Sequence, residues 1–166
     1  LFKVLPVKLR HEGAVVETYC FIDEGSSVSL MDEQLKEELG LEGHVDPLTI
    51  KWANARSQTD HGSRRVKLSI SGEDGRAYTL DNVRTLRDLQ LPEQTLEEAI
   101  VRRFFPVGEG PTPHARVRPR ILLGLRHAHL GLPRECREDP DSELLATRTK
   151  LGWLIYGSGG APGFVG

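Results

Sequence analysis

The alternation of apolar and polar positions predicts a chain built from many short strands. Apolar residues alternate with polar ones from Val4 to Leu9 and from Val15 to Ile22, and the turn signal His11-Glu12-Gly13 between them is typical of a β-hairpin. Further β-prone segments are Val28 to Met31, Thr49 to Ala53, Arg65 to Ser71, Ala77 to Val83, Ile121 to Gly124 and Lys150 to Tyr156. The turn Gly72-Glu73-Asp74-Gly75 joins two of them.

Two segments have the pattern of a short helix instead. From Asp32 to Gly40, acidic residues come first, Leu35 and Leu39 stand four apart, and glycine ends the run. Thr95 and Glu98 have the spacing of a capping box, which predicts a second helix that contains Leu96, Ile100 and Phe104. Many strands and two short helices indicate a mainly β fold.

Length and composition limit the classes that fit. A chain of 166 residues with 38% hydrophobic content supplies one compact domain with a sizeable core. The net charge of −2 provides no overall field for nucleic acid or an anionic membrane. No apolar run approaches the roughly 20 residues that cross a bilayer, so we expect an intracellular, cytoplasmic protein without a membrane partner. Cys20 and Cys136 are far apart and are expected to be free thiols.

The most informative stretch surrounds Asp23. An apolar strand that ends in Phe21-Ile22 delivers an acid onto a tight turn, and a second apolar strand follows. A carboxylate at the end of a core strand is desolvated unless it is paired, which indicates a chemical role. Gly25 permits the turn, and the hydroxyls of Ser26 and Ser27 are expected to stabilise the charged carboxylate.

The motif hydrophobic-hydrophobic-Asp-x-Gly-Ser resembles the active-site signature of aspartic proteases. Leu122-Leu123-Gly124 is similar to the element that supports the catalytic loop in retropepsins and precedes a short helix, here Leu125 to Leu130. The combination of Asp23-Glu24-Gly25-Ser26-Ser27-Val28, Asn82-Val83-Arg84-Thr85 and the segment from Thr149 to Gly157 is similar to the protease region of BEL/Pao-type retrotransposon polyproteins, and this resemblance covers most of the chain. The resemblance implies a retropepsin-like closed β-barrel with two short helices, one lobe per chain.

By this resemblance the chain is an aspartic endopeptidase that processes a polyprotein, in the cytoplasm or within retroelement particles. The family mechanism needs two aspartates that share one proton, so the resemblance implies a homodimer with one Asp23 per subunit. Asp60-His61-Gly62 has the same spacing, but its neighbours are polar, and we reject Asp60 as the second acid. The substrate would be an extended peptide or polyprotein segment.

The resemblance also assigns regions of the chain. The protease domain spans 1–157, with an insertion at 84–120 and a C-terminal strand extension at 144–157, and 158–166 forms a flexible Gly-rich tail. The polar segment from Asn54 to Ser63 takes the place of the flap, a hairpin that closes over substrate. Candidate flap residues are Trp52, Ala53, Asn54 and Ala55. The tail composition and Leu1 indicate a segment of a longer polypeptide.

Glu24 departs from the family pattern, which has Thr or Ser at this position. Two Glu24 carboxylates near a dimer axis would repel each other, which predicts a dimer that is weak or favoured by acid. The alternative to an active protease is therefore a catalytically silent retropepsin fold that serves as a dimerisation or peptide-binding module.

Other polar clusters have more ordinary interpretations. His127 and His129 lack a third ligand, so an exposed pair is favoured over a metal site, and we expect no metal and no cofactor. Pro106 to Pro119 carries four prolines and reads as an exposed loop. The arginines at 116, 118, 120 and 126 have no interleaved aromatic residues, which favours solvated side chains over a nucleic-acid site. Trp153 and Tyr156 are expected on opposite faces of the last strand.

Overall fold

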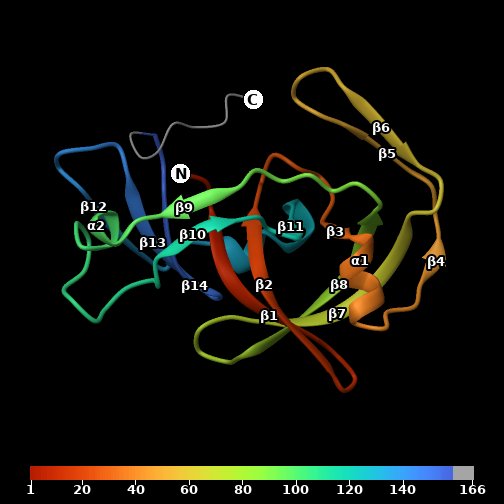
Figure 1. Cartoon of the computed structure of the whole chain (residues 1–166), viewed down its shortest axis with the longest axis horizontal. Helices are drawn as coiled ribbons and strands as arrows, with labels where there is room; N and C mark the ends of the chain where they lie inside the picture. Colours follow the sequence, from red (N-terminus) through yellow and green to blue (C-terminus); the bar gives the residue numbers. More distant parts are fainter. Residues whose placement is uncertain (159–166) are drawn as a thin grey trace.

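The computed structural model describes residues 1–158 and is mainly β, with a closed six-stranded mixed barrel at its centre (Figure 1). The barrel closes because β1 pairs with β2 on one side and with β7 on the other. Around the barrel its strands are β1 (Val4–His11), β2 (Ala14–Ile22), β11 (Ile121–Leu123), β3 (Leu30–Asp32), β8 (Ala77–Leu86) and β7 (Arg64–Ser71). The expected β class and closed barrel are confirmed.

In the barrel, strand β11 from late in the sequence is inserted between two strands from early in the sequence. β11 lies between β2 and β3, parallel to β2 and antiparallel to β3. The connection between β2 and β3 therefore has to pass over the end of β11. This connection carries Asp23.

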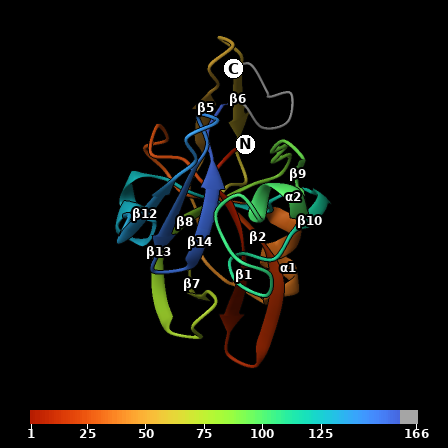
Figure 2. The same ribbon diagram turned by 90° about the vertical axis from the view of Figure 1, so that its left-hand side faces the viewer.

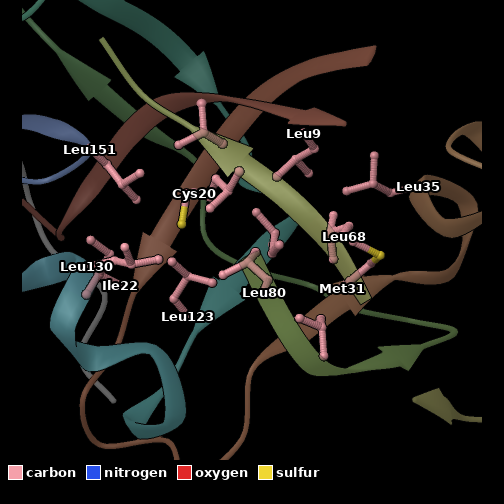
Figure 3. Packing of buried hydrophobic residues seen from close by; sticks show 14 of the residues in the cluster. Leu9, Cys20, Ile22, Met31, Leu35, Leu68, Leu80, Leu123, Leu130 and Leu151 are labelled. Carbon is pink, nitrogen blue, oxygen red and sulfur yellow. The ribbon is translucent and has the colours of Figure 1, made fainter. Parts of the chain in front are cut away.

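The barrel interior is apolar because the inward positions of its strands carry aliphatic side chains. Figure 3 shows them packed together, together with Leu35 from α1 (Glu33–Glu38) and Leu130 from the 3₁₀-helix η1 (Leu125–Gly131). Cys20 is fully buried in this core, and burial raises the pKa of its thiol. Both cysteines are free thiols, as expected.

Three smaller parts surround the barrel (Figures 1 and 2). They are the hairpin of β5 (Leu48–Lys51) and β6 (Ser57–Asp60), the pair of β9 (Gln94–Leu96) and β10 (His114–Val117), and the sheet of β12 (Glu135–Glu138), β13 (Leu145–Thr149) and β14 (Gly152–Tyr156). The short strand β4 (His44–Val45) pairs with the outer edge of β7. Trp153 packs in the cluster with α2 (Glu98–Val101), whereas Tyr156 packs against the barrel core, so the two rings lie on opposite faces as predicted.

Two sequence predictions around residue 100 are wrong. The helix predicted from a capping box is a single turn, and its N-cap is Glu97 without a side-chain cap bond. Thr95 belongs to strand β9, where its hydroxyl accepts the Arg116 N–H at 2.9 Å. The segment from Pro106 to Pro119 is not an open loop throughout, because β10 pairs with β9 and buries His114. Non-local strand pairing has overridden the local capping signal.

His114 provides a pH-dependent contribution to stability. Its ring stacks edge-on against Tyr19, with centroids 5.2 Å apart, and Nδ1 has no hydrogen-bond partner among residues 1–158. Burial lowers the pKa of His114, so the folded protein binds this proton less readily than the unfolded chain does. Below the unfolded value of about 6.5 the unfolded chain holds more protons, and stability falls as the pH falls.

We therefore expect His114→Gln to flatten the pH dependence of unfolding. The urea midpoint of the wild-type protein should decrease from about pH 7 to pH 5, and that of the variant should decrease less. Identical slopes for the two proteins would contradict this assignment.

Candidate active site

Asp23 begins the connection between β2 and β3 and is half-buried. Its N–H donates to the carbonyl oxygen of Leu123 at 2.9 Å, which extends the β2–β11 pairing by one residue. Its Oδ1 accepts the Gly25 N–H at 2.9 Å, and its carbonyl oxygen accepts the Ser26 N–H at 3.1 Å. Within residues 1–158, Oδ2 has no hydrogen-bond donor, so this oxygen is available to a substrate, a water or a second acid.

The predicted support for the carboxylate by Ser26 is wrong. The Ser26 hydroxyl donates to the carbonyl oxygen of Val28 at 2.7 Å and so braces the loop backbone instead. The Gly25 amide takes the role expected of the hydroxyl. Ser27 is exposed at the loop surface.

Gly124 lies directly beneath the Asp23 loop, which we define as residues 23–29, and there is no room for a side chain at this position. A Cβ atom at this position would lie 2.6 Å from the Ser26 carbonyl oxygen, and closer still to that of Val28. The next residue, Leu125, donates its N–H to the Ser26 oxygen at 2.8 Å. Leu123 and Gly124 thus lie where the sequence placed them, directly under the loop that carries Asp23.

A buried polar network that was not predicted from the sequence anchors the far end of the same loop. Ser29 Oγ accepts the Gly124 N–H at 3.0 Å and lies 2.7 Å from Nδ1 of His127. Nε2 of His127 lies 3.2 Å from Oδ1 of Asp81. His127 is only 2% exposed, so the prediction of an exposed histidine pair is wrong for this residue, which belongs to η1. The available signal was Ser29 itself, a polar residue within the apolar run Val28 to Met31.

Glu24 points away from this buried support. Its side chain is 52% exposed and pairs with the ammonium of Lys3 at 3.5 Å. Lys3 also lies over the ring of Tyr156, 4.8 Å from its centroid. The carboxylate that departs from the family pattern therefore has a cation of its own chain beside it.

The candidate flap residues lie at the tip of the β5–β6 hairpin. The Trp52 N–H donates to the Arg56 carbonyl oxygen at 2.8 Å, and Ala55 has a positive φ of 65° in the turn. Figure 1 shows the hairpin projecting from the barrel on the side of the β2–β3 connection. Trp52, Leu48 and Ile50 pack against a buried apolar cluster, and Val28 of the Asp23 loop packs against the same cluster. Hairpin and loop thus share one patch of packing.

Asp60 does not meet Asp23 through any contact within residues 1–158. Its Oδ1 accepts the Gly62 N–H at 2.9 Å and its Oδ2 accepts the Arg87 N–H at 2.8 Å. Oδ1 holds the turn between β6 and β7, and Oδ2 ties this turn to the backbone just after β8. Asp60 therefore has a structural task at the base of the hairpin.

The remaining charged groups mostly pair with one another. Arg116 and Arg118 contact Glu93, Arg120 contacts Glu38 and Asp32, and Arg126 contacts Asp81. Within residues 1–158 no group of three His, Cys, Asp or Glu side chains has the arrangement of a metal site. That part of the chain also contains no helix long and apolar enough to cross a membrane.

The sequence was compared with protein families and with curated proteins. No protein-family model matches the sequence, and no curated protein matches it either.

Proposed function

We propose that this chain is a retropepsin-like aspartic endopeptidase that acts as a homodimer. The observation that carries the proposal is the placement of Asp23. Its backbone is fixed by Leu123 and its Oδ1 by the Gly25 amide, while Oδ2 is left without a donor among the described residues. A rigid loop that presents one open carboxylate oxygen is the half-site that paired-aspartate hydrolysis requires.

The chemistry follows from two such loops facing each other. Two carboxylates a few ångströms apart do not both ionise readily, so they hold one proton between them. The ionised carboxylate takes a proton from a water as that water attacks the peptide carbonyl carbon. The protonated carboxyl donates to the carbonyl oxygen as the tetrahedral intermediate forms. As the C–N bond breaks, the carboxyl that took the proton from water donates it to the leaving nitrogen, and the other carboxylate takes a proton from a hydroxyl of the intermediate. This releases the amine and the new carboxylic acid and restores the pair.

The dimer is part of the proposal because the chain offers one acid of this kind. Asp60, the other Asp-x-Gly aspartate, uses one oxygen to hold its own turn and the other to accept the Arg87 N–H. A two-fold axis close to Asp23 supplies the second carboxylate without any further element.

The β5–β6 hairpin is the proposed substrate cover. A two-stranded ribbon beside the Asp23 loop can pair with an extended peptide through backbone hydrogen bonds. The hairpin and the Asp23 loop pack against the same apolar cluster, which gives a route for hairpin movement to affect the loop. We propose as the substrate a flexible segment of the retroelement polyprotein in which the protease is embedded.

The test is cleavage of a precursor fusion that carries sequence from both sides of this chain, assayed from about pH 4.5 to 7.5. Cleavage at defined sites by the purified protein supports the proposal when sedimentation finds the active species to be a dimer. A protein that remains monomeric throughout this range and cleaves neither the fusion nor a peptide library would overturn it.

Lys3 is expected to strengthen the dimer at neutral pH by compensating Glu24. Lys3→Met leaves two Glu24 carboxylates uncompensated near the proposed axis, and an exposed pair contributes roughly 0.2–1 kcal/mol. With two pairs per dimer, we expect dimerisation to weaken about two- to thirtyfold near pH 7.5. The loss should shrink near pH 4.5, where carboxylates take up protons. Sedimentation equilibrium at both pH values measures this, and an equal effect at both would contradict it.

The second candidate function is a silent dimerisation or peptide-binding module, and Glu24 is the observation that favours it. An ionised Glu24 paired with Lys3 cannot donate the hydrogen bond that the hydroxyl of the family pattern provides. A silent module would dimerise and bind extended peptides without cleaving them. Binding of a precursor peptide without products would select this function.

A further inference from the structure

The polar network of Ser29, His127 and Asp81 joins three parts of the fold at a buried point. Ser29 is 0% exposed and ends the Asp23 loop, His127 belongs to η1, and Asp81 belongs to β8. Because Ser29 is fully buried, it cannot reach a substrate as a nucleophile. The three residue types are those of a hydrolytic triad, but the burial of the serine indicates a structural role.

The hydrogen bonds determine which nitrogen of His127 carries the proton. Ser29 Oγ accepts from the Gly124 N–H, so its own hydrogen needs an acceptor, and Nδ1 of His127 at 2.7 Å is the one available. The proton then resides on Nε2, which donates to Asp81 Oδ1 at 3.2 Å. Within this network of Ser29, His127 and Asp81, every polar hydrogen has a hydrogen-bond acceptor only when His127 is neutral with its proton on Nε2.

The polar network of Ser29, His127 and Asp81 is connected to Asp23 through the backbone around Gly124. Ser29 Oγ holds the Gly124 amide, and the Gly124 carbonyl oxygen accepts the His127 N–H at 3.0 Å. On either side of Gly124, Leu123 holds the backbone of Asp23 and Leu125 holds the backbone of Ser26. The imidazole therefore locks the segment that contacts the start, the middle and the end of the Asp23 loop.

We propose that His127 is a positioning residue for Asp23, acting through Ser29 and Gly124, and that the loop is ordered for catalysis only while His127 is neutral. This inference rests on the proposed function. A proton on Nδ1 would turn the acceptor into a donor and leave the Ser29 O–H without a partner among the described residues. The network would loosen while the fold remains.

The charges around His127 come from its own helix and from β8. Asp81 faces Nε2, and Arg126 and His127 hold the pKa of Asp81 at about 2, so this carboxylate stays ionised throughout the assay range. His129 also lies within electrostatic range of His127, and its Nδ1 lies 3.4 Å from the ammonium of Lys150. A matched control therefore exists two residues away on the same helix.

The decisive variants are His127→Ala, which removes the acceptor, and His127→Asn, whose side-chain oxygen can accept from Ser29 without titrating. We expect His127→Ala to lower kcat about ten- to hundredfold with little change in KM, because a misplaced catalytic group mainly slows the chemical step. His127→Asn should restore most of kcat and remove one ionisation from the acid side of the kcat profile. His129→Asn should leave both kcat and that ionisation unchanged.

The dependence on Ser29 can be tested separately. Ser29→Ala should resemble His127→Ala, and the double variant should be no slower than either single one, because both act through one link. The proposal would be overturned if the losses of kcat in the two single variants were additive. It would also be overturned if His127→Asn kept the wild-type pH profile or failed to recover activity.

A measurement without substrate separates this inference from the proposed function. Amide hydrogen exchange of Gly124, Leu125 and Ser26 should accelerate in His127→Ala and not in His127→Asn or His129→Asn. If the wild-type protein cleaves nothing but exchange follows this pattern, the positioning role holds and the protease fails. If exchange is the same in all four proteins, the positioning role fails whatever the activity.

Discussion

Asp23→Asn is expected to abolish peptide cleavage, with kcat/KM at least about a thousandfold lower, because one side chain serves as base in one subunit and acid in the other. The fold should survive the change. An asparagine oxygen can still accept the Gly25 N–H that Oδ1 accepts at 2.9 Å. The thermal midpoint and the sedimentation behaviour of the variant should therefore match those of the wild-type protein.

Mixing the two proteins tests the shared site directly. A dimer with one Asp23 and one Asn lacks the proton pair, so a threefold excess of the variant should leave about a quarter of the wild-type activity after random exchange of subunits. A monomeric enzyme would lose none. Asp74→Asn is the matched control, since Asp74 Oδ1 accepts the Arg76 N–H at 2.9 Å in the same type of turn. Full cleavage by Asp23→Asn would remove this residue from the mechanism.

Gly124→Ala is expected to have the largest effect on stability. The added methyl group would collide with the carbonyl oxygens of Ser26 and Val28, and both are backbone atoms that cannot rotate away. Overpacking of this kind costs about 1–3 kcal/mol or more, so we expect a loss of about 3 kcal/mol in the free energy of unfolding. Activity should fall further than stability, because the collision displaces the Asp23 loop.

Gly13→Ala provides the control for this prediction. Gly13 lies in the turn between β1 and β2, and a Cβ atom there would meet no atom within 4 Å. Urea unfolding should change by a few tenths of a kcal/mol at most, roughly the effect of an ordinary surface substitution. Equal stability of the Gly124 and Gly13 variants would mean that the loop is not seated on Gly124.

The local parts of the fold could be predicted because their signals are local. Alternation gave the β1–β2 hairpin, and Leu35 with Leu39 gave α1, since each pattern repeats within one element. The placement of Asp23 above Leu123 and Gly124 was also predicted, although 100 positions separate Asp23 and Leu123. That prediction came from the motif resemblance, and hydrophobic periodicity alone does not pair β2 with β11.

The error at Thr95 comes from competition by a partner distant in the sequence, whereas the error at Ser26 comes from the local geometry of the folded loop. Thr95 has the spacing of a helix cap, but Arg116 offers its backbone N–H and Thr95 joins a strand pair instead. Ser26 was expected to bond the Asp23 carboxylate, yet the Val28 carbonyl oxygen lies closer to its hydroxyl in the folded loop. The exposed strand β12 was not predicted because its residues Glu135 to Glu138 carry no apolar alternation, and it is held by pairing with β13 and by contacts of Arg137.

The sequence by itself determined a mainly β chain with one aspartate on a glycine turn after an apolar strand, because these features depend on neighbouring residues. Only the tertiary structure decided that β1 and β7 close the barrel, that Glu24 pairs with Lys3, and that Ser29, His127 and Asp81 meet beneath the loop. These contacts join residues far apart along the chain. Their formation depends on the packing of the whole barrel, which no local pattern encodes.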